Sequence, residues 1–213
     1  MGQPPLTLRP GTERDHSTII GLINNAAEWL RTKNTDQWAQ PWPSGEDRNY
    51  RILRDLRLGR TLIGWDEDTP VATITTTRHN SIWPAEMQHE PAVYASWLVV
   101  ARTHSNRGIG AALLDWTGTR AREVYQARWI RVDVWTTNHT LHAYYVAQGF
   151  EMRGLSERAP DYPSAALFQK ATDHIEPGSA GLFRLARWAR PPPGHARARP
   201  ARAKARTPSR SRG

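Results

Sequence analysis

The segment from residue 93 to residue 135 carries the pattern that most restricts the fold of this chain. Residues 93–100 are β-branched and aromatic, which predicts a buried strand. The sequence SNRGIGAALLDW follows at 105–116 and indicates a glycine turn that leads into a helix over about 108–125. Residues 128–135, RWIRVDVW, alternate in polarity and predict a second strand. A strand, a helix and a strand in this order form a parallel crossover unit, so we expect an α/β fold.

Further strands and helices are predicted on both sides of this unit. Apolar residues at helical spacing predict a helix that ends near Lys33, and Ser44 with Asp47 resembles a capping box for a second helix that ends near Gly59. Strands are predicted at 6–9, 61–65, 71–77, 150–155 and 165–169, and another helix at 141–148. Residues 78–92 show no clear period and are predicted to form a loop.

The positive charge of the chain lies at one end of the sequence. The net charge is +9, yet residues 177–213 hold ten basic residues and no acidic one. Residues 1–176 therefore hold the other 19 basic residues and all 20 acidic ones, so their charges nearly cancel. We therefore expect a domain over 1–176 and a basic, Pro/Arg-rich tail over 177–213 that is disordered except for a short helical turn at 182–188. Binding of nucleic acid is expected, if at all, through this tail.

Composition also excludes several classes of protein. The chain has no Cys, which excludes a disulfide framework, a thiolate metal site and a cysteine nucleophile. No apolar run is long enough to cross a membrane, and residues 1–15 show no signal-peptide pattern. We expect a cytoplasmic protein without a membrane partner.

The glycine turn at 107–111 has the properties of a phosphate site. Glycines let the backbone approach an anion, and the free N–H groups and dipole of a helix start hold its charge. A Walker A loop requires Lys and Ser or Thr where Ala111 and Ala112 stand, and a dinucleotide fingerprint requires a small residue where Leu113 stands. A third candidate ligand is the pyrophosphate of coenzyme A. The turn alone does not separate these ligands from a helix start at which glycine merely packs closely on a strand.

One strand later, the sequence TTNHTLHAYYVAQGF at 136–150 adds a second motif. An apolar strand end at 98–100, the turn RGIGA at 107–111, Asn138 and the pattern Tyr145-x-x-x-Gly149-Phe150 stand in the order and spacing of one family. The chain resembles the GNAT family of N-acetyltransferases over roughly residues 6–170. It departs from the family pattern at Ser105, where Arg or Gln is usual, so Arg107 and the backbone of the turn are expected to bind most of the anion.

This resemblance implies a fold, a reaction and a set of site residues. The fold is GNAT-like mixed α/β, with a central, twisted and splayed sheet of about six to seven strands flanked by about four helices. The reaction is direct transfer of the acetyl group of acetyl-CoA, a co-substrate, to a primary amine, without a metal. Tyr145 is the expected acid for the departing thiolate. The residues expected to bind acetyl-CoA are Leu98, Val99, Val100, Arg107, Gly108, Ile109, Gly110, Ala111 and Asn138.

The acceptor amine and the general base are less constrained. In this fold the first two helices and their connecting loop wall the acceptor site, which suggests Asp36, Trp38, Trp97 and Asp133 as substrate-binding residues. An aromatic pocket for a cationic amine, with Asp36 as its counter-charge, would also draw on Trp29, Trp42 and Trp83; alternatively, these rings cover the edges of the core. Candidates for the base are Asp133, Glu90, His89, His104 and His139.

Other functions remain compatible with the sequence. A GNAT-like domain can bind acyl-CoA without catalysis, and the basic tail can associate with nucleic acid. The partner of an enzyme of this class is a small-molecule or peptide amine, and a homodimer is the oligomeric state we consider.

Overall fold

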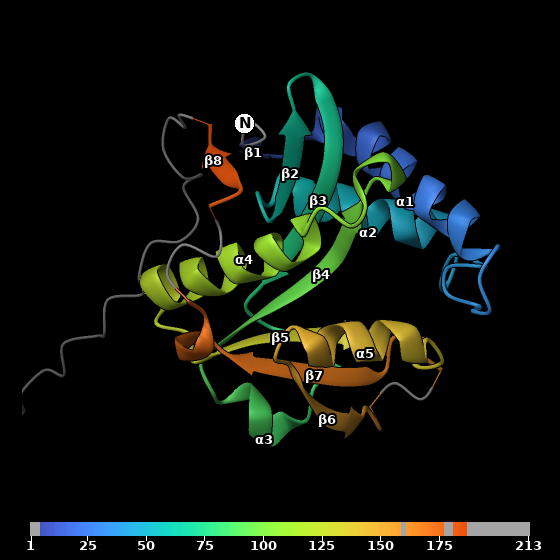
Figure 1. Cartoon of the computed structure of the whole chain (residues 1–213). Coiled ribbons are helices and arrows are strands. Elements are labelled where there is room, and N and C mark those ends of the chain that lie inside the picture. The colour runs from blue at the N-terminus through green and yellow to red at the C-terminus, as the bar shows by residue number, and fades with distance from the viewer. Residues whose placement is uncertain (1–4, 159–160, 177–180, 187–213) are drawn as a thin grey trace, which may run out of the picture.

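The fold is built on one open sheet of eight strands. The computed structural model describes residues 5–158, 161–176 and 181–186. The sheet order is β6-β7-β5-β4-β3-β2-β1-β8 (Figure 1). The strands are β1 (Leu6–Pro10), β2 (Thr61–Asp66), β3 (Thr69–Thr77), β4 (Ala92–Val100), β5 (Trp129–Val134), β6 (Glu151–Leu155), β7 (Ala166–Ala171) and β8 (Phe183–Leu185).

Strand pairing confirms the mixed sheet and its central crossover. β1 to β4 are antiparallel neighbours, β4 and β5 are parallel, and β5, β7 and β6 are antiparallel. The connection from β4 to β5 runs through α4 (Ile109–Tyr125), as the crossover pattern predicts. The strand count exceeds the prediction by one because β8 joins the edge.

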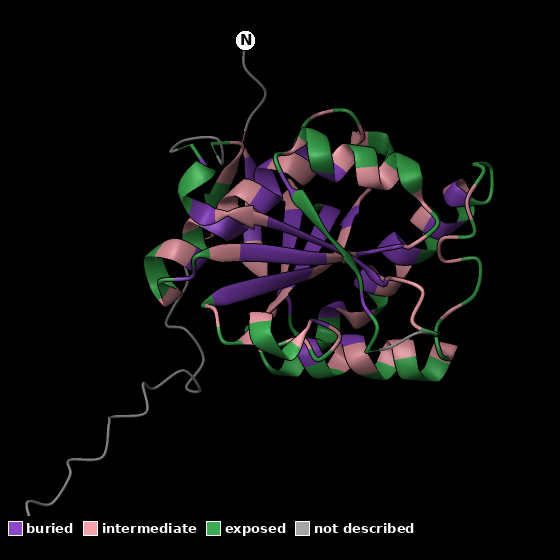
Figure 2. Ribbon diagram, turned by 90° about the horizontal axis from the view of Figure 1, so that it is seen from below, coloured by how far each residue is buried: buried purple, intermediate pink, exposed green. Residues whose placement is uncertain are grey.

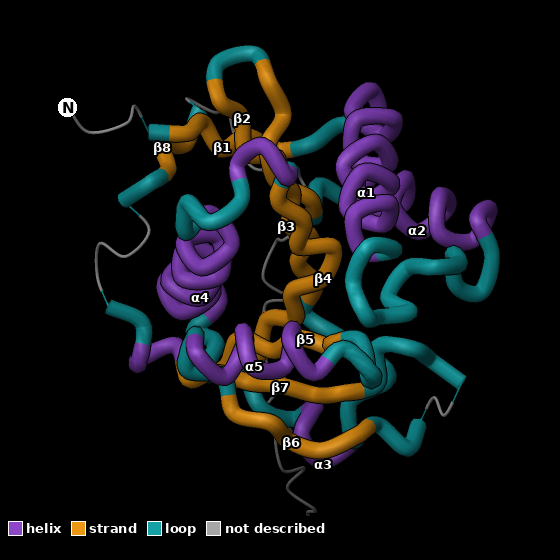
Figure 3. Tube along the Cα trace, turned by 45° about the vertical axis from the view of Figure 1, so that its right-hand side comes forward, coloured by secondary structure: helices purple, strands orange, loops and turns teal. Residues whose placement is uncertain are grey.

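The helices form a layer on each face of the sheet (Figure 3). On one face, α1 (His16–Leu30) and α2 (Gly45–Arg57) bury Ile23, Leu56 and their neighbours against β2 and β4. On the other face, α4 and α5 (His139–Ala147) pack on the largest apolar cluster, which includes Leu113 and Phe168. Buried residues accordingly concentrate on the central strands between the two helical layers (Figure 2).

Two short elements differ from the prediction. Residues 85–88, in the segment predicted as a loop, form the single-turn helix α3 (Ala85–Gln88), which is too short to show a helical period. The helical turn predicted at 182–188 is wrong for 183–185, because these residues form β8 and pair in parallel with Leu6–Leu8 of β1. The remainder of the predicted tail, 177–180 and 187–213, lies outside the described residues.

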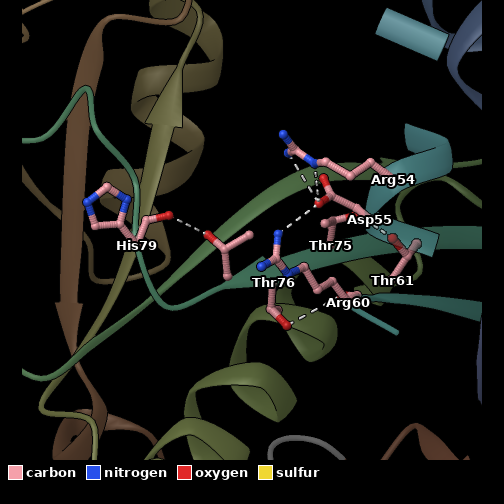
Figure 4. A network of polar contacts seen from close by, with 8 residues as sticks. Arg54, Asp55, Arg60, Thr61, Thr75, Thr76 and His79 are labelled. Carbon is pink, nitrogen blue, oxygen red and sulfur yellow. Dashed lines mark hydrogen bonds and ion pairs between the residues drawn. The ribbon is translucent and has the colours of Figure 1, made fainter. Parts of the chain in front are cut away.

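A polar network fixes α2 to the sheet (Figure 4). Ser44 caps α2 as predicted, since its hydroxyl accepts from the Asp47 N–H at 3.0 Å. At the other end, the Asp55 carboxylate is 4% exposed and accepts from Arg54 at 3.3 Å and Arg60 at 3.2 Å. The hydroxyls of Thr61 and Thr75 lie 2.8 Å apart and join β2 to β3 behind it. The contacts of Asp55 hold the end of α2 beside the start of β2.

In the described ranges, no helix is long and apolar enough to cross a membrane.

Candidate active site

The two central parallel strands separate along their length. β4 and β5 pair from Ala92↔Trp129 to Ala95↔Val132 and no further, while β4 continues beside β3 to Val100. Among the described strands, none pairs with residues 96–100 on the side that faces β5. Their N–H and C=O groups on that side are open to a ligand placed between the strands.

A β-bulge at Trp97 changes the direction of the side chains within β4. Thr75 pairs with Ser96 and Thr73 with Val99, so β4 holds one extra residue, and Trp97 has a φ of 49°. After the bulge, Leu98 and Val100 pack with the α4 and α5 cluster, while Trp97 and Val99 pack with the α1 and α2 cluster. The bulge thus places the predicted Leu98–Val100 segment at the opening between the strands.

The predicted glycine turn leads into α4 beside this opening. Gly108 has a φ of 72°, and a Cβ there would meet no atom within 4 Å. A Cβ on Gly110 would lie 2.8 Å from the Tyr144 hydroxyl, so the turn comes close to α5. The first N–H groups of α4, from Ile109 to Ala111, have no acceptor within the helix.

Arg107 adds a positive charge to the same turn. Its Nη1 lies 3.5 Å from Asp66, which also interacts with His104 at 2.9 Å. Within the part of the chain that the structure describes, the buried Nε atom of Arg107 has no hydrogen-bond partner. A free guanidinium donor, free helix N–H groups and open space at Gly108 fit a phosphate group of coenzyme A.

Tyr145 lies on α5 with its ring in the core. It is 7% exposed, and its ring centroid lies 5.3 Å from Phe150 and 6.0 Å from Phe168. Burial, with smaller contributions from Tyr144 and the charge of Asp133, raises the pKa of Tyr145 above its ordinary value. The phenol therefore stays protonated and can act as a hydrogen-bond donor.

Asn138 begins α5. Its Oδ1 accepts from the Leu141 N–H at 3.0 Å, and its Nδ2 donates to Gln37 at 2.6 Å. Both polar atoms of the side chain thus have partners within the chain. Its predicted contact with acetyl-CoA stays a prediction.

Asp133 is the carboxylate at the opening, on the face of β5 opposite to α5. Its two oxygens accept from Asn80 Nδ2 at 2.9 Å and from the Tyr162 hydroxyl at 3.0 Å. Burial raises the pKa of Asp133 to about 6, against the smaller opposing effects of these hydrogen bonds and of the Arg51 charge. A carboxylate whose pKa is near neutrality can accept a proton from an ammonium group.

The other candidate bases are engaged or lie elsewhere. Glu90 forms an ion pair with the fully buried Arg131, and His104 interacts with Asp66 beside the glycine turn. His89 and His139 are exposed. Of the five candidates, Asp133 directly follows the last residue pair of β4 and β5, Ala95↔Val132, and therefore lies at the opening.

The other predicted acceptor residues lie in the α1–α2 loop, which carries Asp36 and Trp38, and on β4, which carries Trp97. Trp38 stacks near Trp97 with ring centroids 6.4 Å apart. Asp36 accepts hydrogen bonds from Trp135 Nε1 at 2.9 Å and from Thr137, and these donors lower the pKa of its carboxyl and stabilise its negative charge. Asp36 also lines a pocket of about 250 Å³ that reaches Tyr162.

The tryptophans proposed as an aromatic pocket for a cation fall into two groups. Trp83 is fully buried and packs edge-on against Tyr94 at 5.8 Å, so it belongs to the core. Trp29 is covered by the guanidinium of Arg102, 3.7 Å from its ring centroid. Trp42 packs on Tyr162, the hydrogen-bond donor to Asp133, with ring centroids 4.8 Å apart, and forms the second group with Trp38 and Trp97.

Three residues at the site escaped the sequence analysis. Arg51 on α2, Asn80 after β3 and Tyr162 before β7 surround Asp133, and they come from segments far apart in the chain. Nothing in their local sequence signals this role, because the contacts exist only after the sheet and the α1–α2 loop are assembled. No group of three or more metal-ligating side chains occurs among the residues that the structure describes.

A split parallel pair beside a glycine turn at a helix start is the arrangement expected for a GNAT fold, and the comparisons with known proteins agree. Residues 23–150 match the acetyltransferase (GNAT) family, and the chain belongs to that family. YesJ of Bacillus subtilis (strain 168), described as an uncharacterized N-acetyltransferase, is 28% identical over 149 residues, which is 68% of this chain and 81% of YesJ.

Solved structures share the fold. A GNAT family acetyltransferase from Listeria monocytogenes aligns with a TM-score of 0.62 at 20% identity, over 78% of this chain and 94% of the other. The PaiA N-acetyltransferase of Thermoplasma acidophilum, solved in complex with coenzyme A, aligns with a TM-score of 0.60 at 13% identity, over 79% of this chain and 99% of the other.

Proposed function

We propose that this protein is an N-acetyltransferase that uses acetyl-CoA to acetylate a primary amine directly. The observation that carries the proposal is the separation of β4 from β5 beyond Ala95↔Val132, with the glycine turn on one side and Asp133 on the other. Acetyl-CoA supplies a thioester that is activated for attack by an amine. Its amide groups would bind the free backbone of 98–100, and its phosphates would bind Arg107 and the N–H groups of 108–111.

Asp133 acts as the general base in this proposal. Above a pH of about 6 it is a carboxylate, and it takes a proton from the acceptor ammonium so that the amine becomes nucleophilic. Asn80 and Tyr162 hold the carboxylate in place. A backbone N–H in 98–100 is suited to stabilise the oxyanion.

Tyr145 assists the leaving group. Its raised pKa lies above the ordinary pKa of a thiol, so complete proton transfer to a thiolate would be uphill. We therefore assign to Tyr145 a hydrogen bond that stabilises the developing charge on sulfur. The second proton, which the nitrogen loses as the amide forms and the C–S bond breaks, goes to the departing thiolate, so coenzyme A leaves as the free thiol. This role refines that of a simple acid.

Release of free coenzyme A from acetyl-CoA, measured with a thiol reagent across a panel of primary amines, tests the proposal. Tyr145→Phe is expected to lower kcat about 100-fold with little change in acetyl-CoA affinity. Gly110→Glu, which puts a bulky negative charge in the phosphate cradle, is expected to abolish that affinity. If acetyl-CoA binds but no amine releases coenzyme A, the chain is a non-catalytic acyl-CoA-binding domain instead.

Several finer points stay predictions. The location in the cytoplasm, a homodimer and the choice between a small-molecule and a peptide acceptor rest on the sequence alone. Nucleic-acid binding through 177–213 also stays a prediction, which retention on DNA with and without the tail would test across salt concentrations.

A further inference from the structure

Arg51 is a cation on the acceptor side whose binding capacity is largely unused. A guanidinium carries five N–H donors. One Nη donates to the Trp42 carbonyl, while Nε is buried and has no hydrogen-bond partner among the described residues. In the described part of the chain, Arg51 forms no ion pair with a carboxylate within 4.0 Å. A buried donor on a charged group without an acceptor is unfavourable, so this position favours an anion supplied from outside.

The aromatic residues around Arg51 indicate whether a cationic or an anionic ligand group can bind there. The guanidinium carbon lies 5.6 Å from the Trp42 ring centroid and 5.9 Å from that of Trp97. The cation-binding faces of these rings are therefore already used by a side chain of the protein. A second cation there would be repelled by Arg51, whereas an anion would be attracted.

Arg51 and Asp133 present opposite charges from facing elements, α2 and β5. They are close enough for the Arg51 charge to act on Asp133, yet they do not form a direct ion pair. The Asp133 oxygens are bound by Asn80 and Tyr162 instead. A ligand that carries both an ammonium group and an anionic group matches this pair of charges.

We propose that the acceptor is a small amine of the amino-acid type, whose carboxylate binds Arg51 while its amino group meets Asp133. This inference rests on the proposed function and narrows its substrate class. It replaces the expectation of a purely cationic acceptor held by tryptophans and Asp36. Two aromatic rings in contact link the charged groups, because Trp42 lies against Arg51 and Tyr162 donates to Asp133.

The test compares amines that differ only in the carboxylate. Release of coenzyme A is measured for a panel of α-, β- and γ-amino acids and for the amide of each. At least one amino acid is expected to have a kcat/KM about 10-fold or more above that of its amide. Arg51→Gln is expected to remove this difference by lowering kcat/KM for the acid alone, and Arg51→Lys to retain part of it.

Arg57→Gln is the matched control, because Arg57 lies on the same helix in an exposed ion pair with Glu13. Thermal melting of all variants checks that they fold. If amines are acetylated with no preference for a carboxylate, or if Arg51→Gln keeps the preference, the inference is overturned while the proposed function stands.

Calorimetric titration of the same amino acids into the protein separates the two proposals when no amine is turned over. Binding that requires the amino-acid carboxylate and Arg51 then supports the proposed amino-acid site and contradicts only the proposed acetyltransferase activity. Absence of both binding and turnover overturns the inference together with the proposed function.

Discussion

At the scale of single residues, Asp133 links catalysis to pH. Its pKa is raised from the ordinary value of 3.8 to about 6, so between these values the folded protein retains a proton that the unfolded chain releases. Stability from the protonated form is fully present below about pH 4 and is lost as the pH rises through about 6. The loss is on the order of 3 kcal/mol if the whole shift applies.

Asp133→Asn removes this titration. The difference in the free energy of unfolding, variant minus natural protein, is expected to increase between about pH 4 and pH 7 and to stay constant above about pH 7. Urea denaturation at each pH measures it, and a difference that does not vary with pH contradicts the assignment. In the natural protein, kcat/KM should rise through about pH 6, while the variant loses most of its activity at every pH.

Gly110 provides a second prediction at this scale. A Cβ there would lie 2.8 Å from the Tyr144 hydroxyl and 3.8 Å from the ring carbon that carries it. Gly110→Ala is therefore expected to lower stability by about 1–2 kcal/mol, because this overlap outweighs the better helix propensity of Ala.

Tyr144→Phe removes only the oxygen that causes the overlap. In the double variant Gly110→Ala/Tyr144→Phe, most of the loss should disappear, which a double-mutant cycle of denaturation measurements detects as a positive coupling. If the two effects simply add, the close approach of the turn to α5 is not the cause.

At the scale of elements, local patterns located most helices and strands, because hydrophobic period and caps are encoded within each segment. Ser44 predicted the start of α2, and the alternation in 128–135 predicted β5. The elements that were missed, α3 and β8, are four and three residues long and depend on distant partners.

The residues of the site also fall into two groups: those that local sequence predicts and those that depend on tertiary structure. The glycine turn and the Tyr145 motif are contiguous in sequence, so they could be predicted before the fold was known. The bulge at Trp97 has no glycine to signal it, although it determines which face Leu98 and Val100 occupy. Arg51 and Tyr162 reach Asp133 only through tertiary structure, and no local pattern marks them.

The anchoring of α2 gives a prediction for a whole element. Asp55 is buried between Arg54 and Arg60, whose side chains remain partly exposed, so removal of its charge leaves two solvated arginines and no buried cation. Asp55→Ala is therefore expected to lower stability by only about 1–2 kcal/mol. By loosening α2 it should raise KM for the acceptor while acetyl-CoA affinity is kept. Isothermal titration with acetyl-CoA and steady-state kinetics separate these effects, and equal weakening of both substrates would contradict them.

At the scale of the whole molecule, β8 connects two distant parts of the sequence. Phe183–Leu185 pairs with β1, the Leu6 N–H donates to the Leu182 carbonyl at 2.9 Å, and the Ala186 N–H donates to Leu8 at 3.0 Å. Leu182 and Phe183 pack on the main apolar cluster. The sheet therefore uses residues that charge and composition assign to the basic tail.

Two truncations test where the folded unit ends. Removal of 181–213 deletes β8 and exposes the edge of β1, and it should lower stability by roughly 2 kcal/mol, or about 4–8 °C in Tm. Removal of 187–213 keeps every described contact of β8 and should leave Tm unchanged, although it removes nine of the ten basic residues after 176. Phe183→Ala in the full chain should reproduce part of the larger loss, since it removes apolar packing without changing charge. If the two truncated proteins have the same Tm, β8 contributes nothing to the stability of the fold. If only removal of 181–213 lowers Tm, the domain extends to residue 186 and any role of the basic segment is separable from folding.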